Sequence, residues 1–211
     1  ILEGSQGTLL DLDHGTYPFV TSSNPTVGGA LTGTGIGPRS FGGVAGVFKA
    51  YCTRVGSGPF PTELTDKTGD HIRDKAQEFG TTTGRARRVG WFDAVAARYS
   101  VRVNGMDSMI VTRLDILDGF DRIKVCVAYE IDGRRTDRFP VDTLLLGRSK
   151  PVYQDLPGWQ GTTSGLTDPH QLPQGARDYI LRLEELLGIP TSLISTGPRR
   201  EETVVVRPVI P

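Results

Sequence analysis

The sequence predicts an α/β fold with a mainly parallel sheet flanked by helices. Strand-like and helix-like segments alternate along the 211 residues, which is the pattern of βαβ units. One apolar run, residues 109–118, has polar groups at its carboxyl end, where ligands bind in open α/β sheets. The 27 glycines and 14 prolines follow no periodic repeat, so we expect many shaped loops between these elements.

The first third of the chain is expected to begin with a short strand that runs into a long, ordered, glycine-rich segment ending near residue 40. Residues 42–55 carry Val44, Val47, Phe48 and Tyr51 at helical spacing, which predicts a helix. The next segment, residues 66–78, is predicted to be a polar, exposed helix.

The remaining two thirds continue the alternation of helices and strands. The Asp132-Gly133 pair is a strong signal for a hairpin between two strands. Gly188 is expected to end the last helix. The predicted elements are a helix over about 91–104, a buried strand over 109–118, two strands within 122–139, a helix over 173–188, and strands over 191–195 and 204–206.

The bulk composition favours a soluble protein of the cytoplasm. Its 24 basic and 24 acidic residues give a formal net charge of zero, which argues against broad binding of nucleic acid or acidic membranes. Cys52 and Cys126 lie in apolar stretches, as expected of buried thiols in a reducing compartment. No Cys/His cluster indicates a structural metal, and no apolar run is long enough to span a bilayer.

The most informative stretch, residues 78–88, combines two glycines, three adjacent threonines and three arginines. Glycine lets the backbone approach a ligand, and the arginine fork matches carboxylate or phosphate in bidentate fashion. An apolar run starts at Trp91, so we expect the loop to present its charges at a helix N-terminus and to bind a small anion. The alternative is a solvated basic loop.

Three other places could carry chemistry. Gln6 has an amide that suits a purine oxo group, although it could equally be a turn residue. Asp115 follows a predicted strand and could accept two hydrogen bonds from guanine, or it could cap the next turn. Small residues at 195–198 would allow a flat base to lie against the backbone. No catalytic triad, HExxH motif or GxxxxGK[ST] phosphate loop occurs.

Taken together, these segments resemble the adenylosuccinate synthetase family, in order and over nearly all 211 residues. The resemblance implies that residues 1–211 are the C-terminal portion of a single domain, with a P-loop NTPase-like fold that lacks its N-terminal P-loop half. The absence of an initial methionine also favours a segment of something longer. The matching stretches are residues 3–11 (EGSQGTLLD), 14–24 (HGTYPFVTSSN), 49–51 (KAY), 53–56 (TRVG), 58–63 (GPFPTE), 78–88 (EFGTTTGRARR), 114–118 (LDILD), 156–159 (LPGW) and 194–198 (ISTGP).

The resemblance implies a ligase of purine biosynthesis that joins inosine monophosphate (IMP) to L-aspartate with GTP and Mg²⁺. It also implies a homodimer, with Mg²⁺ ligands upstream of this segment and none within it. Carried over onto this sequence, the resemblance implies that IMP is contacted by Gln6, Thr21 and Arg85, with Gln6 as the catalytic contact to its 6-oxo group. It implies that aspartate is bound by Thr81, Thr82, Thr83, Gly84, Arg85 and Arg87. It implies that GTP is bound by Arg87, Arg113, Leu114, Asp115, Ser195, Thr196 and Gly197.

Two positions depart from the family pattern. Ala86 stands where a third consecutive basic residue is usual, and Arg113 stands where lysine is usual. An arginine stem can also lie over a purine face, so guanine binding should survive. Because the phosphate machinery is expected upstream, we expect this chain alone to be inactive. The alternative reading is a catalytically silent guanine-nucleotide-binding module.

Overall fold

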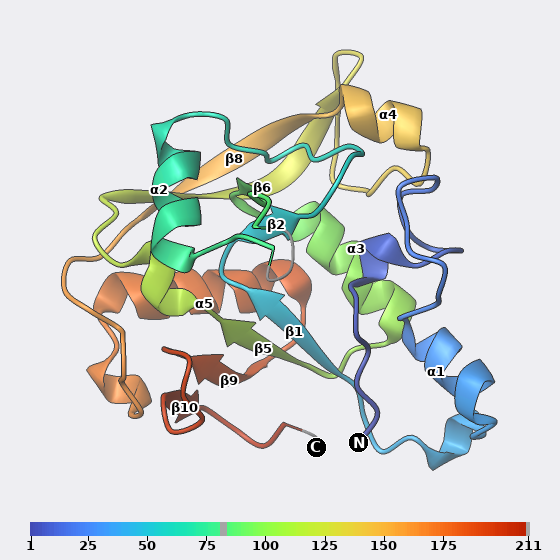
Figure 1. Ribbon diagram of the computed structural model, residues 1–211. Coiled ribbons are helices and arrows are strands. Elements are labelled where there is room, and N and C mark those ends of the chain that lie inside the picture. Colours follow the sequence, from blue (N-terminus) through green and yellow to red (C-terminus); the bar gives the residue numbers. More distant parts are fainter. Residues whose placement is uncertain (81–83, 210–211) are drawn as a thin grey trace.

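A computed structural model describes residues 1–80 and 84–209, and its main sheet confirms the predicted α/β class. The strands β1 (Ala45–Lys49), β5 (Ser108–Thr112) and β9 (Thr191–Ser195) run parallel in that order (Figure 1). The last strand, β10 (Thr203–Val205), pairs antiparallel with β9. The sheet is therefore mainly parallel, as predicted.

Two helices cover this sheet and close its core. The helix α5 (Gln174–Leu187) lies behind β1, β5 and β9 in Figure 1, and it packs against α3 (Ala94–Asn104). Burial of large apolar side chains from both layers drives this packing. The fully buried members of this core include Tyr51, Met109, Leu114, Tyr179, Leu183 and Ile194.

The helix ends follow local chemistry. The Asp93 carboxylate begins α3 by accepting hydrogen bonds from the backbone N–H groups of Val95, at 3.0 Å, and Ala96, at 3.1 Å. The same helix ends at Gly105, which has φ 60°. Asp66 caps α2 (Lys67–Ala76) in the same way, and Gly188 ends α5 with φ 72°. These boundaries confirm the predicted helices over 66–78, 91–104 and 173–188 to within a few residues.

A second sheet stands beside the first and is mostly antiparallel. The long strand β6 (Arg122–Ile131) turns at Asp132-Gly133 into β7 (Arg134–Thr136), which confirms the predicted hairpin. Both turn residues have positive φ, 50° and 76°. The sheet is completed by β8 (Lys150–Pro157), antiparallel to β6, and by β4 (Phe92–Asp93), parallel to it; β8 and the helix α4 (Thr143–Arg148) were not predicted.

The predicted helix over 42–55 is wrong. This segment forms β1, bends at residues 50–51 and continues as β2 (Cys52–Arg54), which pairs with β3 (Arg88–Gly90). Apolar residues three and four apart fit a short buried strand as well as a helix. Pairing with β5 decides in favour of the strand, with Ala45 opposite Ser108 and Lys49 opposite Thr112.

The N-terminal segment also differs from the prediction. Residues 1–7 are exposed and form no strand, because no strand in residues 1–80 or 84–209 pairs with them. The glycine-rich segment instead contains a helix, α1 (Val27–Thr34). Gly29 is needed there, since a Cβ at this position would collide with the Asn24 carbonyl oxygen. Short 3-10 turns complete the fold at Thr8–Leu10, Pro38–Ser40, Leu114–Leu117 and Pro169–Gln171.

None of the helices within residues 1–80 and 84–209 is long and apolar enough to cross a membrane.

Candidate functional site

The parallel register brings two of the predicted segments to one edge of the main sheet. Lys49 at the end of β1 lies opposite Thr112 at the end of β5, and Val111 lies opposite Ile194 on β9. The carboxyl ends of these strands therefore meet, and residues 113–115 and 195–197 follow directly from them. This is the edge at which ligands bind in open α/β sheets.

Residues 113–115 form a tight turn that leaves one carboxylate oxygen unused. Arg113 adopts the left-handed conformation, with φ 63°, and its Nη1 donates to the Ala76 carbonyl at 3.1 Å. Leu114 is fully buried and anchors the turn. The Asp115 Oδ1 is buried and has no hydrogen-bond partner in the part of the chain that the structure describes. Burial is the largest influence on the Asp115 carboxyl and raises its pKa.

A second carboxylate of this turn holds the neighbouring loop, a role that the sequence did not reveal. Asp118 Oδ1 accepts from Trp159 Nε1 at 2.6 Å and from the Thr163 hydroxyl at 2.8 Å. Its Oδ2 accepts from the Thr163 backbone N–H at 2.7 Å. Asp118 is thus saturated while Asp115, three residues earlier, is not. In the sequence, Asp118 was marked only as the last residue of the predicted strand over 109–118 and of the LDILD stretch in the family resemblance.

The segment after β9 is held mainly by bonds within the protein. The Thr196 hydroxyl contacts the carbonyl oxygens of Leu166 and Glu202 at 2.8 and 3.1 Å, and its backbone N–H donates to Glu202. Ser195 donates to the Gly197 carbonyl at 2.9 Å. Thr196 is fully buried, whereas Ser195 and Gly197 are half-buried. Any ligand at this edge therefore meets Ser195 and Gly197 more readily than Thr196.

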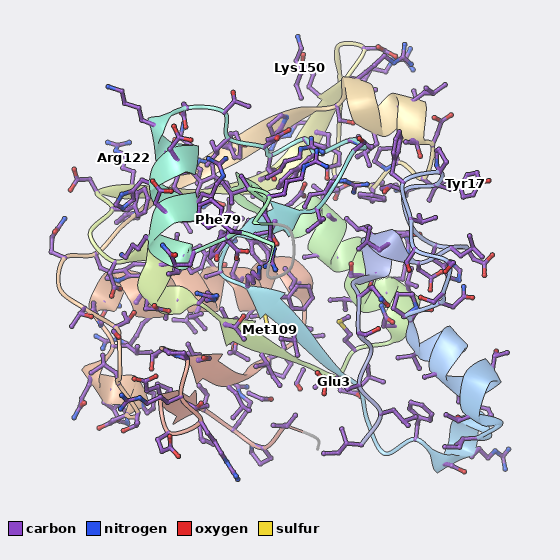
Figure 2. All side chains as sticks on the ribbon, in the orientation of Figure 1. Glu3, Tyr17, Phe79, Met109, Arg122 and Lys150 are labelled. Carbon is purple, nitrogen blue, oxygen red and sulfur yellow. The ribbon has the colours of Figure 1, made fainter. Side chains whose placement is uncertain are left out.

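In the arginine-rich stretch, residues 78–80 pair with residues 84–87 through backbone hydrogen bonds from Gly80 N–H to the Arg85 carbonyl and from Arg87 N–H to the Glu78 carbonyl, both 2.9 Å; we call these two segments the arginine hairpin. Phe79, labelled in Figure 2, lies between α2 and β2 and forms a bridge with Ala86. Residues two apart on an extended segment share a side, so Arg85 and Arg87 flank Ala86 on the opposite side. Gly84 has φ 62° at the turn. The predicted residues Thr81, Thr82 and Thr83 lie outside the described residues.

The hairpin does not lead into a helix as predicted. Two strands, β3 and β4, separate it from α3, which begins at Ala94. Asp93 caps that helix, so no helix N-terminus is offered to the hairpin's arginines. Residues 88–90 pair with β2 as strand β3, where the sequence indicated only a short connection between the arginine-rich stretch and the helix.

The hairpin base contains a functional group that sequence reasoning missed. Glu78 is fully buried, and its carboxylate contacts Lys49 Nζ, the Tyr51 hydroxyl and Arg87 Nη1 at 2.6, 2.7 and 2.8 Å. Burial works to raise the Glu78 pKa, but the bonds from Lys49, Tyr51 and Arg87 outweigh it, so the pKa is lowered. The available signals were the Lys49-Ala50-Tyr51 stretch and the first position of the 78–88 stretch, both in the family resemblance.

Gln6 and Thr21 come together in the N-terminal loop. The Gln6 Oε1 accepts from the Ser5 hydroxyl at 2.7 Å and lies 3.4 Å from the Ser23 hydroxyl, which lies 3.5 Å from Thr21 Oγ1. Asp11 is fully buried beneath this loop. It orders the loop by accepting hydrogen bonds from backbone or side-chain groups of Asp13, His14, Asn24 and Thr26.

Arg54 links this loop to the strands beside the arginine hairpin. Its Nη2 donates to the Thr16 hydroxyl at 3.0 Å and to the Phe19 carbonyl at 3.1 Å. Arg54 lies on β2 opposite Arg88 on β3, which directly follows the hairpin. The loop with Gln6 and Thr21 and the hairpin with Arg85 and Arg87 are therefore braced through one pair of strands.

Two hollows lie elsewhere and contain none of the predicted residues. One of about 330 Å³ and one of about 530 Å³ share Arg98 and Asp137 in their walls. Within residues 1–80 and 84–209, no group of three or more His, Cys, Asp or Glu side chains could hold a metal ion.

Known proteins match this chain over its full length. Residues 1–204 match the family model described as adenylosuccinate synthetase. Adenylosuccinate synthetases from Mycobacterium tuberculosis (strain H37Rv) and Parafrankia sp. are 59% and 57% identical over 210 residues. Each match covers 100% of this chain but 49% of the relative. The chain thus spans about half the length of the curated relatives it matches.

Solved structures agree with the sequence matches. The structure of a fully ligated adenylosuccinate synthetase from Plasmodium falciparum superposes with a TM-score of 0.93 at 39% identity. That match covers 97% of this chain and 49% of the Plasmodium chain. A cyanophage S-2L succinoaminodeoxyadenylate synthetase superposes with a TM-score of 0.58 at 17% identity, which shows a shared fold alone.

Proposed function

Because this chain belongs to the adenylosuccinate synthetase family, a family of ligases, we propose that it supplies the base- and aspartate-binding half of a GTP-dependent enzyme. The reaction is the joining of IMP to L-aspartate. GTP phosphorylates the 6-oxygen of IMP, and the aspartate amine then displaces phosphate to give adenylosuccinate. The rest of the enzyme contributes a P-loop-like phosphate-binding half.

The unpaired oxygen of Asp115 is the observation that carries this proposal. A buried acceptor without a partner costs free energy, and a ligand that donates a hydrogen bond removes that cost. Guanine offers two adjacent donors, N1–H and the exocyclic amine, whereas adenine lacks this pair. We assign guanine to this turn, with Arg113 and Leu114 beside it and Ser195, Thr196 and Gly197 on the neighbouring strand end. Guanine binding should lower the raised pKa of Asp115.

The arginine hairpin is assigned to the aspartate substrate. Arg87 uses Nη1 to bind Glu78, and its Nε is buried without a partner among the described residues. An Nε–H beside an Nη2–H forms the side-on fork that binds a carboxylate in bidentate fashion. Gly84, Arg85 and the hydroxyls of Thr81, Thr82 and Thr83 complete the proposed aspartate loop. Arg87 also serves GTP in this assignment, and Arg85 serves IMP.

Gln6 and Thr21 are assigned to IMP. The Gln6 amide donates to the 6-oxo group and orients it for phosphorylation, and Thr21 binds the IMP phosphate. Their common neighbour Ser23, within 3.5 Å of both side chains, supports a shared ligand. The buried Asp11 keeps the loop that presents Thr21 in shape.

Mg²⁺ is the expected cofactor, because phosphoryl transfer depends on neutralising charge on the phosphates. The described residues contain no group of three or more His, Cys, Asp or Glu side chains that could hold such an ion. We assign its ligands to the phosphate-binding half, and we propose that the complete enzyme acts as a cytoplasmic homodimer.

The test joins this chain to the part of the M. tuberculosis relative that it does not cover. Adenylosuccinate formation is then measured with IMP, GTP and aspartate, and with each omitted in turn. Turnover that requires all three supports the proposal. A fusion that binds GTP but shows no aspartate-dependent turnover would favour the alternative, a silent guanine-nucleotide-binding module.

A further inference from the structure

Glu78 is the point at which the arginine hairpin is fastened to the main sheet. Its side chain is 1% exposed, and its two oxygens have different partners. Oε1 accepts from Lys49 Nζ and from the Tyr51 hydroxyl, both at the carboxyl end of β1. Oε2 accepts from Arg87 Nη1 at 2.8 Å. One carboxylate thus bridges the sheet edge and the hairpin.

The backbone of Arg87 is fixed from the same side. Its N–H donates to the Glu78 carbonyl at 2.9 Å, and its own carbonyl accepts from Arg73 Nε at 3.0 Å. Gly80 and Arg85 continue the hairpin with a further backbone bond of 2.9 Å. Because the backbone N–H and carbonyl of Arg87 are both hydrogen-bonded, the further bond from its side chain to Glu78 leaves the guanidinium little freedom to rotate.

The remaining hydrogen-bonding edge of Arg87 includes a nitrogen without a partner among the described residues. Its Nε is buried and has no partner in the part of the chain that the structure describes, and its side chain is 31% exposed. An Nη1 bound by Glu78 leaves the Nε and Nη2 edge for a planar anion. The buried carboxylate therefore does not neutralise the site; it selects which edge of the arginine faces a ligand.

We propose that Glu78 is a positioning residue that orients Arg87 for side-on binding of a substrate carboxylate. This proposal rests on the proposed function, which gives Arg87 to L-aspartate. Glu78 makes no contact with substrate. Its effect passes through Arg87, so the aspartate-binding step should depend on it more than the binding of GTP.

The deciding comparison is Glu78→Gln against Glu63→Gln. Glu63 pairs with Arg88, the residue next to Arg87, through two bonds of 2.7 and 2.5 Å. The two substitutions are chemically identical and each breaks an ion pair with an arginine, but the Glu63 side chain is 27% exposed and only Glu78 contacts Arg87. In the fusion enzyme, Glu78→Gln should raise the KM for aspartate about tenfold or more, with little change in the KM for GTP. Glu63→Gln should change neither KM by more than about threefold.

A second readout needs no turnover. Phenylglyoxal modifies arginine, and the extent at Arg87 is read by peptide mass spectrometry on the 211-residue chain. Glu78→Gln should increase modification of Arg87 at least severalfold, while Glu63→Gln should leave it unchanged. If the wild-type fusion does not use aspartate but Arg87 is still modified more in Glu78→Gln than in Glu63→Gln, the proposed substrate is wrong, whereas the positioning of Arg87 by Glu78 is supported. Unchanged labelling, or a folded Glu78→Gln fusion with wild-type KM for aspartate, would overturn the proposal.

Discussion

The fold uses the carboxylates at the end of β5 and at the base of the arginine hairpin in opposite ways. Glu78 takes three side-chain donors, and its pKa is lowered. Asp115 keeps a buried oxygen without a partner, and its pKa is raised. Burial is the main cause of the raised pKa of the Tyr51 hydroxyl, and Glu78, followed by the weaker influence of Asp115, raises it further.

The contrast separates scaffolding from recognition. A saturated buried carboxylate fixes its neighbours and has no capacity left for a ligand. An unsatisfied one stores an unfavourable free energy that a suitable donor removes. Two carboxylates, one just after β5 and one just after α2, therefore have different functions. Only their partners distinguish them.

The largest expected effect concerns the chain by itself. The phosphate-binding half of the enzyme is assigned to the part that this chain does not cover. The 211-residue chain mixed with IMP, aspartate, GTP and Mg²⁺ should therefore form no adenylosuccinate, a loss of many orders of magnitude. A coupled assay on the purified chain measures this, with the fusion enzyme as the positive control. Turnover that copurifies with the chain alone would contradict the assignment.

The next effect contrasts the stability of two variants. Glu78→Gln should lower the free energy of unfolding by about 3 kcal/mol at pH 7, because it removes the buried carboxylate that pairs with the partly exposed Lys49 and Arg87. Asp115→Asn should stay within about 1 kcal/mol of wild type, since it removes a buried charge that has an unpaired oxygen. Urea denaturation of the two variants measures both values.

The pH dependence of these variants has opposite signs. The lowered pKa of Glu78 gives stability that is present above its ordinary value of 4.5 and is lost as pH falls through the folded pKa. The raised pKa of Asp115 makes wild type lose stability, relative to Asp115→Asn, as pH rises above 3.8. For each variant, the difference in the free energy of unfolding from wild type is measured as a function of pH. If the Glu78→Gln and Asp115→Asn differences changed in the same direction with pH, the two regions would not differ as described.

Two substitutions in the arginine hairpin test its proposed role in binding aspartate. Arg87→Lys keeps the charge but loses the planar fork, so in the fusion enzyme it should weaken aspartate use by about 1.5–3 kcal/mol. Ala86→Lys adds a charge on the other side of the hairpin and should be nearly neutral. Steady-state kinetics with varied aspartate compares them. Equal, near-wild-type values for both would mean that the hairpin is a solvated basic face.

A third buried carboxylate, Asp93, lies between the two extremes. It caps α3 and bonds to the Tyr129 hydroxyl at 2.6 Å, yet burial raises its pKa to about 6. The folded state therefore holds a proton between about pH 4 and 6 that the unfolded state releases, and stability falls as pH rises through this window. Asp93→Asn should remove this fall in the free energy of unfolding, which is about 3 kcal/mol for a pKa raised from 3.8 to about 6. Thermal or urea unfolding between pH 4 and 7 tests this, and parallel curves for both proteins would count against it.

Much of the fold was predictable because local chemistry and tertiary structure agree. The caps Asp66 and Gly188 and the Asp132-Gly133 turn mark their elements directly in the sequence. The predicted helix over 42–55 failed because its five-residue apolar run fits either structure, and only pairing with β5 settles it. The missed α1 contains three glycines, which disfavour a helix until Gly29 is packed against Asn24.

The sequence could propose candidate site residues where residue type carries chemistry. Asp115 was proposed because guanine needs a paired acceptor, and Arg87 was assigned through the family resemblance. Glu78, Asp118 and Asp11 could not be proposed in this way, because their importance lies in partners up to 45 residues away along the chain. No single-sequence pattern shows that such a carboxylate is buried and saturated.

The most direct test of the account is a nucleotide titration of the fusion enzyme and its Asp115→Asn variant. GDP and inosine diphosphate differ only in the exocyclic amine, which is one of the two donors assigned to Asp115. Wild type should bind GDP at least tenfold more tightly than inosine diphosphate, and Asp115→Asn should abolish that preference and weaken GDP binding by about 1.5–3 kcal/mol. Equal affinities in wild type, or an unchanged preference in Asp115→Asn, would show that the unpaired carboxylate after β5 does not read guanine.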